Sequence, residues 1–190
     1  MDSHTVGYII GSLSADSINR TLSKALIRLA PNNLAFQEIP IGNLPLYNRD
    51  LDDAYPPAGQ ALKSAIAAVD ALLFVTPEYN RGLPGVLKNA IDWASRPYGT
   101  NSFEHKPSAV IGASPGKIGT ALAQQSLRSA LSFCNSPQMT APEAYIQIAP
   151  GLITDDGTVT EASTEQFLRD YMEAFGAFVT RVLAVLPRVV

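Results

Sequence analysis

The sequence is poor in the two residue types that most often bind metals. Cys134 is its one cysteine, so neither an internal disulfide nor a multi-cysteine metal site can form, and a buried, inert thiol is expected. It has two histidines, His4 and His105, which are far apart in the chain and lack ligands at metal-site spacing. We therefore expect no metal site.

Long apolar runs and a strong excess of one charge are also missing. The most apolar run, Ala71 to Val75, is far shorter than the roughly 20 residues that cross a bilayer, and residues 1–4 lack the charged and apolar regions of a signal peptide. The formal net charge of −3 comes from interspersed charges and gives no basic patch for nucleic acid. We expect a cytoplasmic protein without membrane or nucleic-acid partners.

Short apolar runs alternate with longer amphipathic patterns along the whole chain of 190 residues. This predicts one α/β domain over residues 1–190: a doubly wound, five-stranded parallel sheet with helices on both faces. The expected strands are Thr5–Ile10, Leu34–Glu38, Ala71–Thr76, Ser108–Gly112 and Glu143–Ile148. The expected helices are Ser17–Leu29, Gly59–Ala68, Pro84–Ser95, Ile118–Phe133 and Ser163–Leu186. Either common doubly wound order places ligands at the carboxyl ends of the strands.

A hydroxyl-rich turn, GSLSADSINR, follows the first strand and opens a helix. Such a turn is suited to phosphate, because helix N-termini offer free amides. Gly11 is its one glycine, so the G-x-G-x-x-G pattern of dinucleotide sites is missing. The turn therefore predicts a single terminal phosphate, held by helix amides and the hydroxyls of Ser12, Ser14 and Ser17. The alternative is an ordinary N-cap at Ser17 with a solvated first turn.

Two further turns follow the third and fourth expected strands. In the first, TPEYN, Pro77 stiffens the backbone, Tyr79 offers an aromatic face and Asn80 a bidentate amide. The second is Ser114–Gly119, SPGKIG. Loops at one sheet edge converge, so these two are expected to hold a flat ring. The alternatives are a Tyr79 packed on its own domain and simple turn chemistry after the fourth strand.

Taken together, the motifs resemble those of the NADPH-dependent FMN reductase family, flavodoxin-like enzymes that include quinone, azo-dye and chromate reductases. The matching motifs are GSLxxxSxNR at 11–20, TPEYN at 76–80, PGxLKNAIDW at 84–93 and SPGxIG at 114–119. The resemblance spans nearly the whole chain and implies the strand order 2-1-3-4-5 and bound FMN. The predicted cofactor-binding residues are Ser12, Ser14, Ser17, Ile18, Asn19, Pro77, Glu78, Tyr79, Asn80, Ser114 and Gly116.

The resemblance also implies an activity. A hydride passes from NADPH or NADH to FMN and then to quinones, free flavin or similar small acceptors by a ping-pong mechanism. No catalytic side chain is expected, because flavin N5 carries the chemistry, and Tyr79 and Asn80 orient the ring. Glu78 is expected to use its backbone, with its side chain facing solvent or a neighbouring subunit. Family members often have arginine where this chain has Ser14 and Leu122.

Two other functions remain open at this stage. One is a flavodoxin-type electron carrier with FMN but without NAD(P)H turnover, although a net charge of −3 is not the strongly acidic surface of such carriers. The other is an interaction or regulatory protein that has lost the flavin. The aromatic face expected on Ser163–Leu186 and the apolar content of 83–93 predict a homodimer, or a homotetramer as the resemblance suggests.

Overall fold

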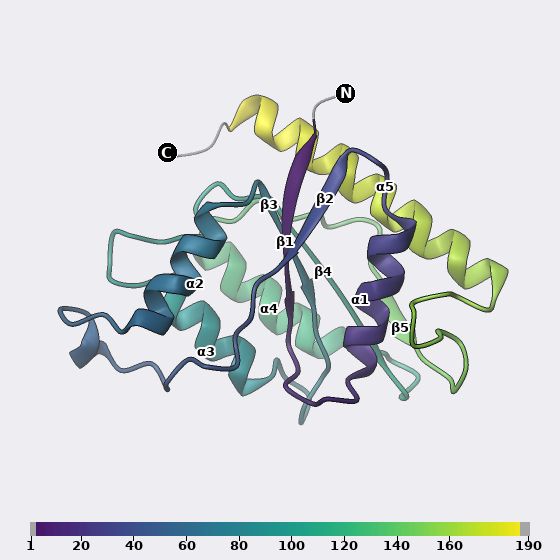
Figure 1. The fold of residues 1–190 in the computed structure, drawn as a ribbon, viewed down its shortest axis with the longest axis horizontal. Coiled ribbons are helices and arrows are strands. Elements are labelled where there is room, and N and C mark those ends of the chain that lie inside the picture. Colours follow the sequence, from purple (N-terminus) through teal and green to yellow (C-terminus); the bar gives the residue numbers. More distant parts are fainter. Residues whose placement is uncertain (1–2, 187–190) are drawn as a thin grey trace.

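Five parallel strands form one sheet in the order β2-β1-β3-β4-β5 in a computed structural model, which describes residues 3–186 (Figure 1). The predicted flavodoxin-like order is therefore confirmed. Residues 187–190 lie outside the described part, as do residues 1–2, which belong to the segment expected to lack a signal peptide. The strands are β1 (His4–Ile10), β2 (Leu34–Glu38), β3 (Ala71–Val75), β4 (Ser108–Ser114) and β5 (Tyr145–Gln147).

The central strand β3 shows why the apolar runs carry no polar alternation. All five of its residues are buried, and successive side chains point to opposite faces of the sheet. Leu73 and Val75 pack in one core, whereas Leu72 and Phe74 pack in the other. Each such side chain contributes about 1.5–3 kcal/mol by its burial. A sheet with two buried faces needs this continuous apolar sequence.

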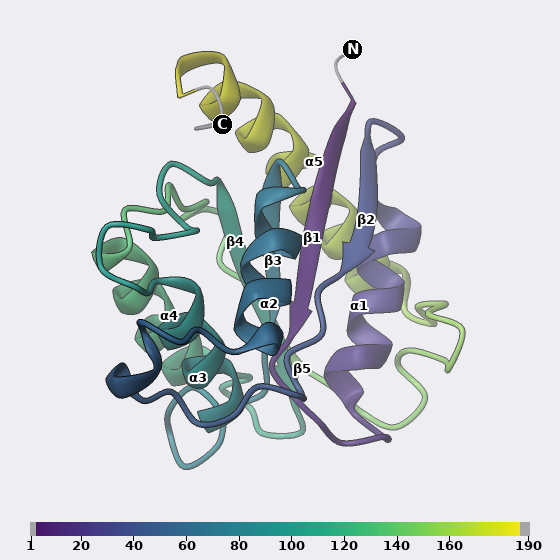
Figure 2. The same ribbon diagram turned by 60° about the vertical axis from the view of Figure 1, so that its left-hand side comes forward.

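Helices cover both faces of the sheet (Figures 1 and 2). The first and last helices share one core with the sheet, and the other three share the second core. The helices are α1 (Ile18–Leu29), α2 (Pro57–Ala67), α3 (Gly85–Ala94), α4 (Ala121–Phe133) and α5 (Ala162–Val185), and a short 3-10 helix, η1, spans Arg49–Leu51. Among residues 3–186, none of these helices combines the length and apolarity needed to cross a membrane.

The predicted elements are all present, and the differences lie at their ends. Helix α2 begins at Pro57, two residues earlier than expected, because proline is tolerated at the first helical position, where no intrahelical donor is needed. Strand β5 is reduced to three residues. All three pair with β4 on one side, so β5 is a short strand at the edge of the sheet.

The expectation that the aromatic face of α5 is available to a partner subunit is wrong for Tyr171 and Phe175, whereas Phe167 on the same helix is exposed. Tyr171 and Phe175 are fully buried, and the Tyr171 hydroxyl donates to the Val110 carbonyl oxygen at 3.0 Å. They pack in the same core as α1 and the sheet. The helical periodicity predicted an apolar face correctly, but this face covers the protein's own sheet.

The connection between β2 and α2 is anchored over α3. The rings of Tyr47 and Tyr55 meet the Trp93 indole edge-on, with centroid distances of 5.1 and 5.0 Å. The indole Nε1 donates to the Pro45 carbonyl oxygen at 2.7 Å, and Trp93 is fully buried. Edge-on aromatic pairs are favourable, so they fix this long segment to the domain. Trp93 is a core residue.

Candidate active site

The loops that follow β1, β3 and β4 leave the sheet at the same edge. Ile10 is in register with Val75, and Val75 is in register with Ile111, so the three strands run level near their carboxyl ends. The chain also reverses its direction of winding between β1 and β3, because β2 lies on one side of β1 and β3 on the other. This is where doubly wound folds bind their ligands.

The first loop presents hydroxyls and amides at the start of α1. Ser12 is buried, and its Oγ accepts a hydrogen bond from the Ser14 amide at 3.3 Å. Ser17 stands at the N-cap position, but its side chain makes no capping hydrogen bond. The amides of Ile18 and Asn19 lie in the first turn, where a helix has no partner for them. This set of donors fits a phosphate group.

Asn19 is not on a solvated turn. It is 1% exposed, and its side-chain amide is hydrogen-bonded to the backbone of Ala113 at the end of β4. Its side chain therefore joins α1 to β4, which leaves the backbone amide of Asn19, in the first turn of the helix, as the group that a ligand could use. The alternative of a solvated first turn is wrong for this residue.

Arg20, the next residue, anchors α1 to the edge of the sheet. Its guanidinium makes two hydrogen bonds of 3.0 Å to the carboxylate of Glu38, which also accepts from the Tyr8 hydroxyl at 3.2 Å. The hydrogen bonds from Arg20 hold the pKa of Glu38 below its usual value, against the opposing effect of burial. Arg20 is thus already paired, and the first loop presents no other cation.

The second loop contains a tight hairpin. The backbones of Tyr79 and Gly82 exchange two hydrogen bonds, of 3.1 and 3.0 Å. The residues between them, Asn80 and Arg81, have φ values of 51° and 64°, in the left-handed region. Asparagine adopts this region readily, whereas arginine does so less often. The hairpin leaves Tyr79 52% exposed, so its ring is available to a ligand.

The prediction that the Glu78 side chain faces solvent or a subunit neighbour is wrong. The side chain is only 6% exposed, and it accepts hydrogen bonds from the amides of Leu122 and Ala123. Burial alone would raise its pKa, but these amides and Arg81 together outweigh that effect and lower the pKa. No local pattern around Glu78 indicates these two hydrogen bonds, because the amides that donate them lie 44 and 45 residues further along the chain.

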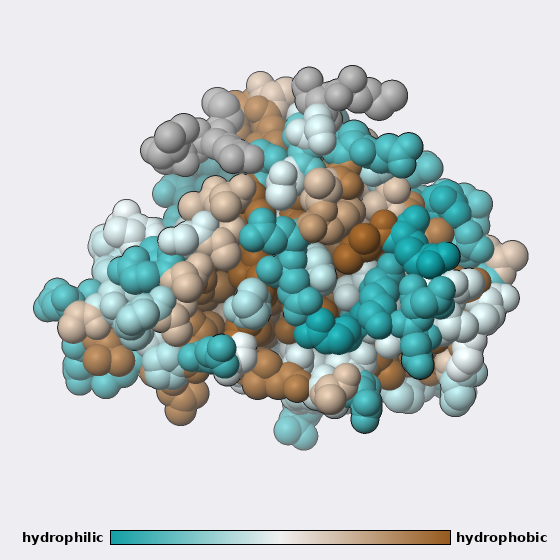
Figure 3. All heavy atoms as spheres, in the orientation of Figure 1, coloured by the Kyte–Doolittle hydropathy of each residue, from teal (hydrophilic) through white to brown (hydrophobic). Residues whose placement is uncertain are grey.

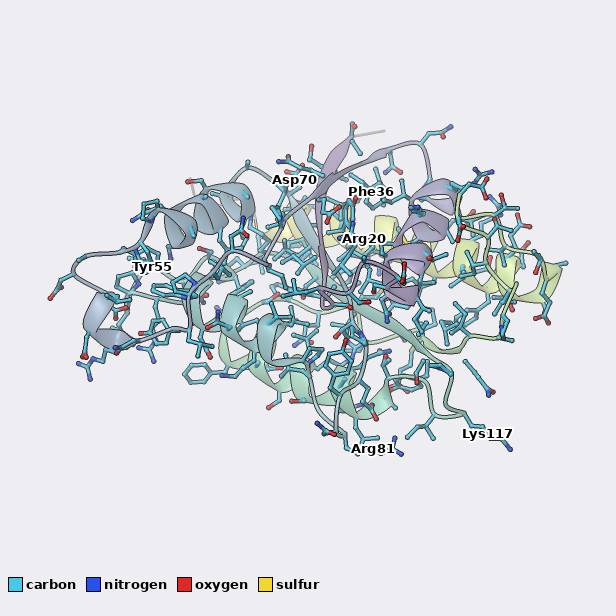
Figure 4. All side chains as sticks on the ribbon, turned by 60° about the horizontal axis from the view of Figure 1, so that its bottom comes forward. Arg20, Phe36, Tyr55, Asp70, Arg81 and Lys117 are labelled. Carbon is cyan, nitrogen blue, oxygen red and sulfur yellow. The ribbon has the colours of Figure 1, made fainter. Side chains whose placement is uncertain are left out.

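The third loop turns sharply between β4 and α4. The Ser114 Oγ accepts from the Gly116 amide at 3.1 Å, and the Gly119 amide donates to the Gly116 carbonyl oxygen at 3.0 Å. Gly119 has φ +57°, and a Cβ there would lie 2.8 Å from the Tyr145 carbonyl carbon, so the turn requires glycine. Lys117 is exposed, and Figure 4 shows it along the same edge of the molecule as Arg81.

A cavity of about 650 Å³ lies beside the first turn of α1. Ser17 and Ile18 of the first loop and Pro115 of the third loop contribute to its lining, together with the segment that follows β5. Within the described residues, the three loops therefore offer hydroxyls, amides and one exposed aromatic ring. Such groups bind and orient a ligand, and the redox chemistry would come from a cofactor.

Known proteins resemble this chain over most of its length. A family model described as NADPH-dependent FMN reductase matches residues 4–151. A 2-hydroxy-1,4-benzoquinone reductase from Burkholderia sp. is 44% identical over 174 residues, which cover 92% of this chain and 95% of the relative. A quinone reductase from Pseudomonas putida is 44% identical over 177 residues, covering 93% of this chain and 95% of the relative.

A solved structure agrees with these sequence matches. FerB, a flavoenzyme NAD(P)H:(acceptor) oxidoreductase from Paracoccus denitrificans, superimposes with a TM-score of 0.90 at 47% sequence identity. The match covers 94% of this chain and 98% of FerB. The fold, the three converging loops and the sequence matches lead to one assignment: the chain belongs to the NADPH-dependent FMN reductase family.

Proposed function

We propose that this protein is an FMN-dependent NAD(P)H oxidoreductase that reduces quinones. Its relatives include a 2-hydroxy-1,4-benzoquinone reductase and a quinone reductase at 44% identity over more than nine tenths of the chain. The observation that carries the proposal is the alignment of the three loops at the switch point of the sheet. We include in the proposal a single FMN-binding domain over residues 1–190 that works in the cytoplasm, where NAD(P)H is available.

In this proposal the first loop binds the FMN phosphate and the other two loops hold the ring. Its support is the uncommitted hydroxyl of Ser17 at the helix start and the exposed ring of Tyr79. When bound, FMN supplies an atom, N5, that accepts and donates hydride. The protein then has to hold the ring with one face open. The nicotinamide and the acceptor use that face in turn, which gives ping-pong kinetics.

The test starts from purified protein incubated with FMN. We expect quenching of FMN fluorescence, a yellow protein after removal of free flavin, and loss of the yellow colour on addition of NADPH or NADH alone. Steady-state rates with benzoquinone should give parallel lines in double-reciprocal plots. Bleaching that requires a separate reductase would favour an electron carrier instead. A protein that stays colourless in excess FMN would contradict the proposal.

We further propose a homodimer that forms through α3 and α4. A groove of about 920 Å³ runs between these helices and is lined in part by Tyr98 and Phe133, whose exposed fractions are 92% and 90%. Large apolar side chains at such exposure are typical of interaction surfaces. In Figure 3, hydrophobic residues are visible over the side of α2 and α3, whereas the side of α1 is mostly hydrophilic.

Light scattering of the wild type and of Phe133→Ser tests this assembly. We expect a species of about twice the 20.3 kDa chain mass, or four times for a homotetramer, and dissociation of the variant to monomers at micromolar concentration. Phe167→Ser, on the solvent side of α5, is the matched control, because Phe167 is also exposed but does not line the groove. A wild type that is monomeric throughout would contradict the proposed dimer.

A further inference from the structure

The carboxylate of Glu78 reaches from the loop after β3 to the start of α4. Its Oε2 accepts from the Leu122 amide at 2.9 Å and from the Ala123 amide at 3.1 Å. These are the second and third residues of the helix, whose amides lack intrahelical partners. Thr120, at the N-cap position, makes no side-chain capping bond. Glu78 therefore caps α4 from a different loop.

The other carboxylate oxygen is joined to the hairpin. Glu78 Oε1 lies 2.9 Å from Nη1 of Arg81. Arg81 is in the left-handed region, with φ 64°, which is unfavourable for a residue with a Cβ. Two mutual backbone hydrogen bonds close the hairpin between Tyr79 and Gly82. The ion pair thus adds a side-chain contact to the two backbone hydrogen bonds that hold this strained turn.

Burial and charge make this contact more than an incidental surface pair. The side chain of Glu78 is only 6% exposed, whereas that of Arg81 is 65% exposed. A carboxylate is favourable beside the positive end of the α4 dipole, and Arg81 compensates the charge on its other side. Without the carboxylate, the two α4 amides and the Arg81 guanidinium would lose their partner at the same time.

We propose that Glu78 is a positioning residue, whose carboxylate locks the Tyr79–Gly82 hairpin to the first turn of α4 and so fixes the separation of the two turns that flank the flavin ring. The consequence for flavin binding rests on the proposed function. The lock itself is a property of the protein alone, and it is measurable without flavin.

Hydrogen exchange of the flavin-free protein tests the lock. The variants are Glu78→Ala and Glu78→Gln, and the matched control is Glu165→Gln, which breaks a Glu–Arg pair of 2.8 Å within α5. We expect Glu78→Ala to speed exchange of the Leu122 and Ala123 amides about tenfold, the usual effect of a lost N-cap. Glu78→Gln keeps the shape and one acceptor oxygen, so its effect is smaller, and it replaces the alanine variant if that variant does not fold.

Flavin binding tests the positioning role. With FMN, Glu78→Ala should bind about tenfold more weakly, and its saturated form should show altered visible circular dichroism of the flavin and a lower kcat. Glu165→Gln should match the wild type in all three. Unchanged exchange at 122 and 123 in Glu78→Ala overturns the lock. Faster exchange with wild-type FMN affinity and circular dichroism overturns the positioning role. A wild type that does not bind FMN contradicts the proposed function, and the exchange data still decide the lock.

Discussion

The side-chain amide of Asn19 forms a two-point contact with the backbone of Ala113. Its Nδ2 donates to the Ala113 carbonyl oxygen at 3.0 Å, and its Oδ1 accepts from the Ala113 amide at 2.9 Å. Both residues are almost fully buried, and they lie 94 positions apart. The contact ties the first turn of α1 to the end of β4, so it holds the first loop in place relative to the third.

Replacing Asn19 with aspartate should destabilise the protein by about 3 kcal/mol, because a buried carboxylate then faces the Ala113 carbonyl oxygen. Urea unfolding at pH 7 measures this decrease in the free energy of unfolding. Protonation restores a donor, so the gap to the wild type should narrow as the pH falls toward 4. Asn32→Asp, at an exposed position, is the control and should change stability by less than about 0.5 kcal/mol. A variant as stable as wild type at pH 7 would refute the role of this contact.

Ser14→Arg should tighten FMN binding about tenfold, because the variant supplies a cation beside the phosphate-binding loop. Ser14 is exposed, and Arg20 is already paired with Glu38, so the wild-type loop has no free cation. Fluorescence titration at low and high salt measures the effect, which should shrink as salt rises. Riboflavin, which lacks the phosphate, is the control ligand. Equal tightening of riboflavin would show that the arginine does not act on the phosphate.

Tyr55→Phe should change the alkaline stability of the protein. Burial, followed by the charge of Asp52, raises the pKa of Tyr55 to about 12, and its hydroxyl donates to the Trp93 carbonyl oxygen. The raised pKa stabilises the fold fully below pH 10, and this contribution is lost as the pH rises from 10 through 12.

At pH 8 the Tyr55→Phe variant should be about 1 kcal/mol less stable than the wild type, because it lacks the hydrogen bond. This gap should narrow above pH 10, since Tyr55 ionises first in the unfolded wild type and favours its unfolding. Urea unfolding at pH 8 and pH 11 measures both values. If the difference in free energy of unfolding between wild type and variant is the same at both pH values, the raised pKa of Tyr55 is contradicted.

Gly112→Ala should cost at least about 3 kcal/mol, because a Cβ there would lie 2.0 Å from the Thr76 carbonyl oxygen and 2.4 Å from the Thr120 Oγ1. The contacts involve backbone and buried atoms that cannot move away. Gly85→Ala is the matched control. Nothing lies within 4 Å of its new Cβ at the start of α3, so it should stabilise the protein by roughly 0.5 kcal/mol. Thermal unfolding of both variants is sufficient, and similar melting temperatures for the two would be inconsistent with this packing.

Much of the site could be predicted because its parts are local in sequence. The apolar strand β3 and the turn that follows it are contiguous, and the helix that begins near Pro84 could be predicted from the same segment. The prediction for Glu78 was wrong because two of the partners of its carboxylate are amides of a helix far along the chain. The hydrogen bonds of its carboxylate to α4 depend on how two distant loops are placed.

The sequence by itself determined the succession of strands and helices along the chain, the burial of both faces of the sheet, and the three turns that follow its strands. These follow from periodicity, turn chemistry and chain connectivity, which act between near neighbours. Only the tertiary structure decided that Tyr171 and Phe175 of α5 face the protein's own core, that Asn19 binds Ala113, and that Glu78 caps α4. Each is a contact between residues far apart in the chain, and its partner is set by packing geometry, which no local pattern encodes.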